Sequence, residues 1–163
     1  MHARHVFAAL LIGLLTSGPA QAATITLQAV LNGANEVPGP GDADGSGLAT
    51  VTIDTIALTV VWEITVADID PIFAAHIHIG DSTVAGDVRV DFSGQLSGGP
   101  LFDEDLALVA ADPAGWYVNV HNEPFQGGAI RGQLFRVATV PEPGTAGLLL
   151  LGLLGAAGIR RRH

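Results

Sequence analysis

Cysteine and lysine are both absent from this chain of 163 residues. Without cysteine no disulfide can stabilise the fold, so stability must come from a hydrophobic core, with or without the help of a bound metal ion. Without lysine, only three arginines oppose 15 acidic residues between positions 23 and 139, which gives this part a net charge of −12. Because nucleic-acid binding depends on cationic side chains, the composition predicts no nucleic-acid partner.

Motifs for nucleophilic catalysis are lacking as well. The chain has no cysteine, and it contains no Gly-x-Ser-x-Gly sequence, which would place a reactive serine at a sharp turn between a strand and a helix. These absences favour a binding or structural protein over an enzyme, and the sequence assigns no catalytic residue.

The N-terminus has the composition of a secretory signal. Basic residues precede the apolar stretch from Val6 to Leu15, and Ala20 and Ala22 are small residues at the positions that signal peptidase reads. The sequence therefore predicts a signal helix within residues 1–22, which signal peptidase removes by cleaving after Ala22.

The last 24 residues, 140–163, combine a proline-rich start, an apolar run and a basic end. The apolar run from Ala146 to Ile159 has 14 residues, which is short of the roughly 20 that a stable membrane-spanning helix needs. By the positive-inside rule, the arginines that follow it would remain in the cytoplasm while the rest of the chain lies across the membrane. The residues at the two ends of the run are Pro141, Glu142 and Pro143, and Arg160, Arg161 and Arg162.

This tail resembles the PEP-CTERM sorting signal of Gram-negative bacteria, with a short apolar transmembrane helix at about 145–159. The resemblance implies that an exosortase recognises and processes the tail while it holds the protein in the inner membrane. The mature protein would then reach the cell surface or the extracellular matrix. The physical pattern by itself leaves a plain membrane anchor open as the alternative.

The remaining residues, 23–139, are enough for one hydrophobic core and not for two. Apolar and polar residues alternate along several segments, which is the pattern of strands with one buried face. The predicted strands are Ile25–Leu31, Ala49–Asp54, Leu58–Val66, Ala75–Ile79, Val88–Phe92, Trp116–Asn122 and Ile130–Val137. Together they predict an all-β domain, an antiparallel sandwich or barrel, with one short helix at Asp103–Ala111.

Two histidines stand two positions apart in one predicted strand. His76 and His78 would therefore point to the same face, with Cα atoms about 6.5–7 Å apart. His121 occupies a similar segment, and no other histidine occurs between positions 23 and 139. If the two strands are neighbours, the three imidazoles form a copper or zinc site outside the core. The alternative is that they are ordinary solvated side chains.

Two further segments contain possible metal ligands. Gly41–Gly47 begins like a calcium loop, but Ile53 stands where the twelfth position of such a loop requires glutamate, so a flexible turn is favoured. Glu36, within Asn35–Pro38, is either a ligand or a turn residue, and the turn is again favoured.

Several separated segments resemble the CHRD domain, which is named after chordin and is also found in exported bacterial proteins. They are Leu31–Pro38, Ala75–Gly80, Tyr117–His121 and Gly127–Leu134. The resemblance spans essentially all of Ala23 to Val137, with one departure, because Ala129 stands where the family commonly has an acidic residue. It implies a β-sandwich of immunoglobulin-like or superoxide-dismutase-like character, with no settled biochemical function.

The link to copper-zinc superoxide dismutase suggests a role for the histidines. That enzyme carries a His-x-His pair of copper ligands on a strand, facing away from the core. By analogy His76 and His78 would be ligands, with His121 as a third. Residues 23–139 offer no fourth histidine and no cysteine, so dismutase activity is not expected even if a metal binds.

The sequence also gives an expectation for Arg131. By its parity with Ile130 and Leu134, Arg131 is expected to point away from the core and to pair with a carboxylate, either Asp91 or Glu123.

Two functions are consistent with these patterns. The leading one is a non-catalytic module, processed by exosortase, that binds exopolysaccharide or surface proteins or supports the extracellular matrix. The alternative is a copper- or zinc-binding domain that uses His76, His78 and His121 for redox chemistry, metal capture or structural support.

Overall fold

The computed structural model describes residues 23–138. The predicted signal peptide, 1–22, and the predicted sorting tail, 140–163, lie outside the described residues, as does the apolar segment at about 145–159. Among residues 23–138, no helix has the length and apolar character needed to cross a membrane.

Nine strands account for most of the described chain, and all of their pairings are antiparallel. Their bounds are β1 (Thr24–Asn32), β2 (Ser46–Asp54), β3 (Thr59–Ala67), β4 (Ile72–Ile79), β5 (Val88–Asp91), β6 (Ser97–Phe102), β7 (Trp116–Asn122), β8 (Phe125–Gln133) and β9 (Phe135–Arg136). The helical pieces are short: η1 (Gly33–Asn35), α1 (Leu106–Ala111) and η2 (Pro113–Gly115). The all-β prediction is therefore confirmed.

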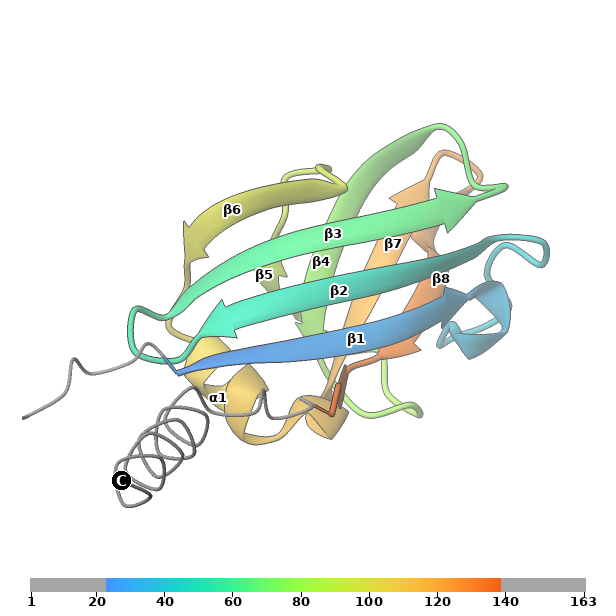
Figure 1. The fold of residues 1–163 in the computed structure, drawn as a ribbon. Helices are drawn as coiled ribbons and strands as arrows, with labels where there is room; N and C mark the ends of the chain where they lie inside the picture. Colours follow the sequence, from blue (N-terminus) through green and yellow to red (C-terminus); the bar gives the residue numbers. More distant parts are fainter. Residues whose placement is uncertain (1–22, 139–163) are drawn as a thin grey trace, which may run out of the picture.

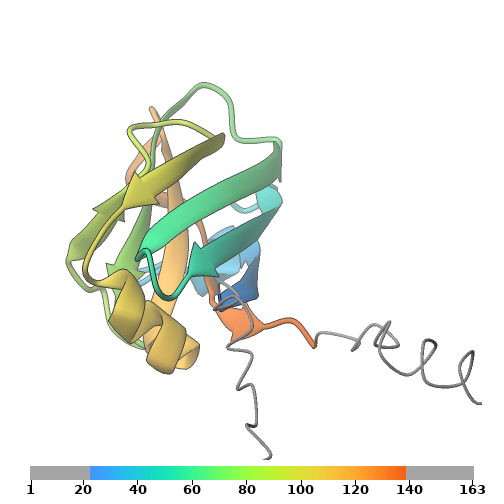
Figure 2. The ribbon, with the colours of Figure 1, turned by 60° about the vertical axis from the view of Figure 1, so that its left-hand side comes forward.

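The strands form one sheet in the order β5-β4-β7-β8-β1-β2-β3-β6, with β9 beside β1. The sheet curls so that β1, β2, β3 and β6 form one layer and β4, β5, β7 and β8 form a second layer behind it (Figures 1 and 2). Apolar side chains from both layers fill the space between them, among them Val51 and Val60 from one and Ile77 and Val118 from the other. A curled sheet thus encloses the core as the two layers of a sandwich would.

The predicted elements differ from the observed ones mainly where glycine and proline interrupt the alternation. Strand β6 was not predicted, because its Ser-Gly-Gly-Pro start offers no apolar and polar alternation. Strand β8 starts at Phe125, before the predicted Ile130, and its continuation is the separate strand β9. Helix α1 starts at Leu106, not at Asp103.

Strand β7 is buried along its whole length, on both faces. Its inner face belongs to the core, whereas its outer face is covered by two segments, which we name the 33–45 loop and the 80–88 loop after their residues. The 33–45 loop is held by a hydrogen bond from the Asp42 N–H to the Ala129 carbonyl. The 80–88 loop is held by Arg131, which donates to the Val84 carbonyl at 2.9 Å. A polar layer is thereby enclosed between the sheet and these loops.

Candidate metal centre

Strand register places the three predicted histidines together on the outer face of the sheet. His76 and His78 alternate along β4 with the core residues Ala75 and Ile77. In the pairing of β4 with β7, His121 lies opposite Ala74. Ala74 precedes His76 by two residues on β4, so His121 lies on the same face of the sheet as His76. The sequence predicted that the three imidazoles meet only if their strands are neighbours. β4 and β7 are neighbours, and the imidazoles do meet.

The distances between the imidazoles suit a single ion. The nitrogen atoms that could bind a metal all lie within 4.8 Å of one another. His76 Nδ1 and His121 Nε2 are 3.3 Å apart, which is about the separation of two nitrogens that bind one tetrahedral zinc ion at about 2.0–2.1 Å. A rotation of the His78 side chain would be needed to bring its nitrogen to the same ion.

Backbone carbonyls decide which nitrogen of two of the rings is free. His78 Nδ1 is 2.9 Å from the Gly86 carbonyl oxygen, and His121 Nδ1 is 3.0 Å from the Gln126 carbonyl oxygen. Because a carbonyl only accepts, each Nδ1 must carry the proton, and each Nε2 then presents a lone pair. Metal-binding histidines generally have such an outer hydrogen bond, which orients the ring and fixes its tautomer.

His76 is oriented the opposite way. Its Nε2 is 3.6 Å from a carboxylate oxygen of Asp91, and its Nδ1 faces His121 Nε2. Because His121 Nδ1 carries its proton, His76 Nδ1 donates a hydrogen bond to His121 Nε2 when no ion is bound. Moving the His76 proton to Nε2, which faces Asp91, would free both nitrogens for a cation. An ion that replaced this proton would be held by His76 Nδ1 and by Nε2 of the other two rings.

Burial favours the uncharged form of the three rings. It lowers the pKa of His78 from 6.5 to about 4, against a smaller raising effect of the Gly86 carbonyl. Burial is also the main cause that lowers the pKa values of His76 and His121. In addition, His78 Nε2 is a buried atom without a hydrogen-bond partner. Neutral imidazoles with free lone pairs are the form that binds a metal.

The chemistry of the donors narrows the choice of ion. Three imidazole nitrogens without thiolates favour zinc or copper(II), whereas calcium and magnesium prefer oxygen ligands. Three protein ligands also leave one position of a tetrahedral ion for water or another ligand. The His76 side chain is 16% exposed, so that position can communicate with solvent.

Arg131 does not make the ion pair that the sequence suggested. It lies on the predicted outer face but is only 1% exposed, because the 80–88 loop covers it. Its guanidinium lies 3.4 Å from the centre of the Tyr117 ring and donates to the Asp81 and Val84 carbonyls and to Gln133. Asp91 contacts His76 instead of Arg131.

Glu36 is more than the turn residue that the sequence favoured. Its side chain is buried at 7% exposure and accepts a hydrogen bond from Asn119 Nδ2 at 3.4 Å. Burial raises the pKa of Glu36 from 4.5 to about 7, although Arg131 lowers it. In the Gly41–Gly47 segment, Asp42 accepts a hydrogen bond from Asn122, and no cluster of metal ligands forms there among the described residues.

Sequence reasoning missed two residues that support the centre. Asp91 was considered only as a partner for Arg131, and its alignment with His76 depends on the pairing of β4 with β5. Tyr117 stacks on His78, with ring centres 4.8 Å apart, and its hydroxyl accepts a hydrogen bond from the Gly86 N–H. The alternation along β7 predicts that Tyr117 shares the outer face with His121, and the sequence holds no other sign of its contact with His78.

Comparison with known proteins agrees with the resemblances found in the sequence. A family model described as the CHRD domain matches residues 27–134, and one described as the PEP-CTERM protein-sorting motif matches residues 139–162. No curated protein and no solved structure matches the chain. The sorting motif indicates export from a Gram-negative bacterium with processing by exosortase, to a surface or extracellular destination. With a family model covering most of its length, the chain belongs to the CHRD domain family.

Proposed function

We propose that this protein is an exported module that binds one zinc or copper(II) ion through His76 Nδ1, His78 Nε2 and His121 Nε2. The observation that carries the proposal is the convergence of three imidazoles whose ligand nitrogens lie within 4.8 Å of one another, with two of the rings oriented by backbone carbonyls. Histidines that serve only as solvated surface residues need no such set of partners.

The proposal brings together the two functions that the sequence suggested. Export and exosortase processing take the domain to the surface or outside the cell, and the histidine cluster gives it a ligand there. Binding is non-catalytic in this account, since the role of the three imidazoles is to hold the ion. Exopolysaccharide and surface proteins remain candidate partners of the same module.

The test is a competition titration of the full chain, purified in mild detergent, with zinc and with copper(II) against a chromophoric chelator. We expect one ion per chain in the parent and loss of that binding in the His76→Ala, His78→Ala, His121→Ala variant. The matched control is His2→Ala, His5→Ala, His163→Ala, which removes the same number of imidazoles elsewhere in the sequence. Equal binding by the two triple variants would refute the proposal.

A further inference from the structure

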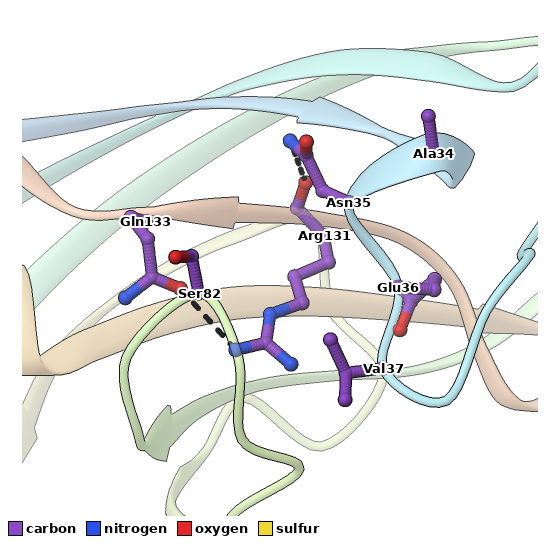
Figure 3. Close-up of a pocket in the computed structure, with 7 residues that line it drawn as sticks. All are labelled: Ala34, Asn35, Glu36, Val37, Ser82, Arg131 and Gln133. Atoms are coloured by element: carbon purple, nitrogen blue, oxygen red, sulfur yellow. Dashed lines mark hydrogen bonds between the residues drawn. The ribbon is translucent and has the colours of Figure 1, made fainter.

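A second polar site lies beside the metal centre, between the 33–45 loop, the 80–88 loop and β8. It is a pocket of about 280 Å³, shown in Figure 3. Its lining residues are Ala34, Asn35, Glu36, Val37, Ser82, Arg131 and Gln133. None of the three histidines contributes to it, so the inference that follows does not depend on metal binding.

Arg131 is a buried cation without a counter-ion. Among residues 23–138, the ion pairs within 4.0 Å are His76–Asp91 and Arg89–Asp105, so no carboxylate oxygen comes that close to Arg131. One terminal nitrogen, Nη2, donates to carbonyl and amide oxygens, but Nε and Nη1 have no hydrogen-bond partner. The Tyr117 ring, 3.4 Å from the guanidinium carbon, offsets part of the cost of burying this charge. It does not supply the carboxylate that an arginine normally binds through two nitrogens at once.

Glu36 is the second incompletely bonded group at the pocket. Its Oε2 accepts the hydrogen bond from Asn119, but its Oε1 is buried without a partner. Burial raises the pKa of Glu36 to about 7, so near neutral pH the carboxyl group is protonated in a large fraction of molecules. In that form Glu36 can donate a hydrogen bond and does not neutralise Arg131.

We propose that this pocket binds a small organic acid, whose carboxylate becomes the counter-ion of Arg131 and accepts a hydrogen bond from protonated Glu36. The Asn35 amide oxygen and the Ser82 hydroxyl at the pocket are available for the polar remainder of the ligand, whereas the Gln133 amide is already bonded to Arg131 and to backbone carbonyls. The volume is just below that of sites for drug-sized ligands, about 300–1,000 Å³, and therefore suits a hydroxy acid or a single sugar acid.

A carboxylate fits better than phosphate or sulfate for two reasons. Its planar pair of oxygens matches the planar guanidinium fork. It also carries a single negative charge, whereas a dianion would be repelled more strongly by a domain with a net charge of −12. Because Arg131 Nε and Nη1 are closed to solvent, the proposal includes a side-chain rotation of Val37, which lines the same pocket, when the ligand binds.

Binding is coupled to the protonation of Glu36. The groups that face this carboxyl are Arg131 on β8, Asn119 on β7, which does not titrate, and the Val37 backbone. Asp81 on the 80–88 loop and His78 on β4 are the other titratable groups that interact with Arg131. Since Glu36 must be protonated to donate, affinity falls as the pH rises through 7, by about tenfold between pH 5.5 and pH 8.

The experiment is a calorimetric titration of the full chain in mild detergent with D-galacturonate and with D-galactose, which lacks the carboxylate, at pH 5.5 and pH 8. We expect galacturonate to bind at least tenfold more tightly than galactose at pH 5.5. Equal affinities for the two sugars, or no binding of galacturonate at 10-millimolar concentrations, about the weak limit for a specific small ligand, would overturn the proposal.

Two variants locate the site. Glu36→Gln keeps the shape and a donor but cannot ionise, so galacturonate should bind to it with no dependence on pH, while the exposed control Glu63→Gln keeps the roughly tenfold dependence. Arg131→Gln should abolish binding, with its folding checked by thermal unfolding. If Arg131→Gln does not fold, the pH dependence of galacturonate binding to Glu36→Gln is the deciding measurement. If that dependence is the same as in the parent, the ligand does not bind beside Glu36.

Discussion

At the scale of single residues, the position of one oxygen atom determines the chemistry of each imidazole. The Gly86 and Gln126 carbonyls hold the protons of His78 and His121 at Nδ1. Asp91, 3.6 Å from His76 Nε2, is placed to stabilise a proton there when Nδ1 binds an ion. The sequence predicted the three histidines but not these three oxygens, because two belong to the backbone and the third depends on strand register.

Replacing Asp91 by asparagine tests the assigned orientation of His76. The variant removes the charge that attracts the His76 proton to Nε2, so Nδ1 becomes a weaker ligand and the affinity for zinc should fall by about tenfold. Asp87→Asn, in the 80–88 loop just before β5, serves as the control and should bind as the parent does. The competition titration measures both, and equal affinities would show that Asp91 does not position His76.

Two buried groups should give opposite slopes to the pH dependence of stability. The pKa of His78 falls from 6.5 to about 4 on folding, so the unfolded state binds more protons and stability rises with pH in this range. The pKa of Glu36 rises from 4.5 to about 7, so the folded state binds the additional proton and stability falls with increasing pH between these values. The two effects oppose each other between pH 4.5 and 6.5.

The variant Glu36→Gln separates these contributions. It should make the free energy of unfolding rise with pH more steeply than in the parent between pH 4.5 and 6.5, by up to about 1.4 kcal/mol per pH unit. The measurement is urea unfolding with a metal chelator present, and Glu63→Gln is the control. Parallel curves for Glu36→Gln and the parent would mean that Glu36 is not protonated in the folded state.

At the scale of elements, the site is made by two strands and the loops that cover them. Alternation along β4 and β7 predicted which faces the histidines share, because a period of two is a local property. Their meeting requires β4 to pair with β7, although β5, β6 and α1 lie between them in the chain. The burial of Glu36 and Arg131 depends in the same way on loops folding over the sheet, which no local pattern records.

Two glycines test whether the 80–88 loop positions His78. A Cβ at Gly86 would lie 1.5 Å from the Ile79 carbonyl oxygen, so Gly86→Ala must displace the carbonyl that holds His78. A Cβ at Gly127 would meet nothing within 4 Å, which makes Gly127→Ala the matched control. We expect Gly86→Ala to weaken zinc binding by about 10–100-fold, and Gly127→Ala to leave it unchanged. Unaltered zinc binding by Gly86→Ala would show that the 80–88 loop does not position His78.

At the scale of the whole molecule, the curled sheet separates two functions of the same strands. The inner faces form the apolar core, which stabilises a chain that has no cysteine and therefore no disulfide. The outer faces of β4, β7 and β8 carry the enclosed polar layer. Composition and alternation were sufficient to predict the all-β fold. The sorting motif at the C-terminus was predicted equally well, because its signal is contained in a short continuous segment.

The metal content of the protein as it is isolated tests the central claim most directly. Mass spectrometry should be applied to the full chain and to the His76→Ala, His78→Ala, His121→Ala variant, both purified in mild detergent without added metal or chelator. We expect close to one zinc or copper ion per chain in the parent and almost none in the variant. A parent without metal that also fails to take up either ion when it is supplied, or equal metal in both proteins, would contradict the claim.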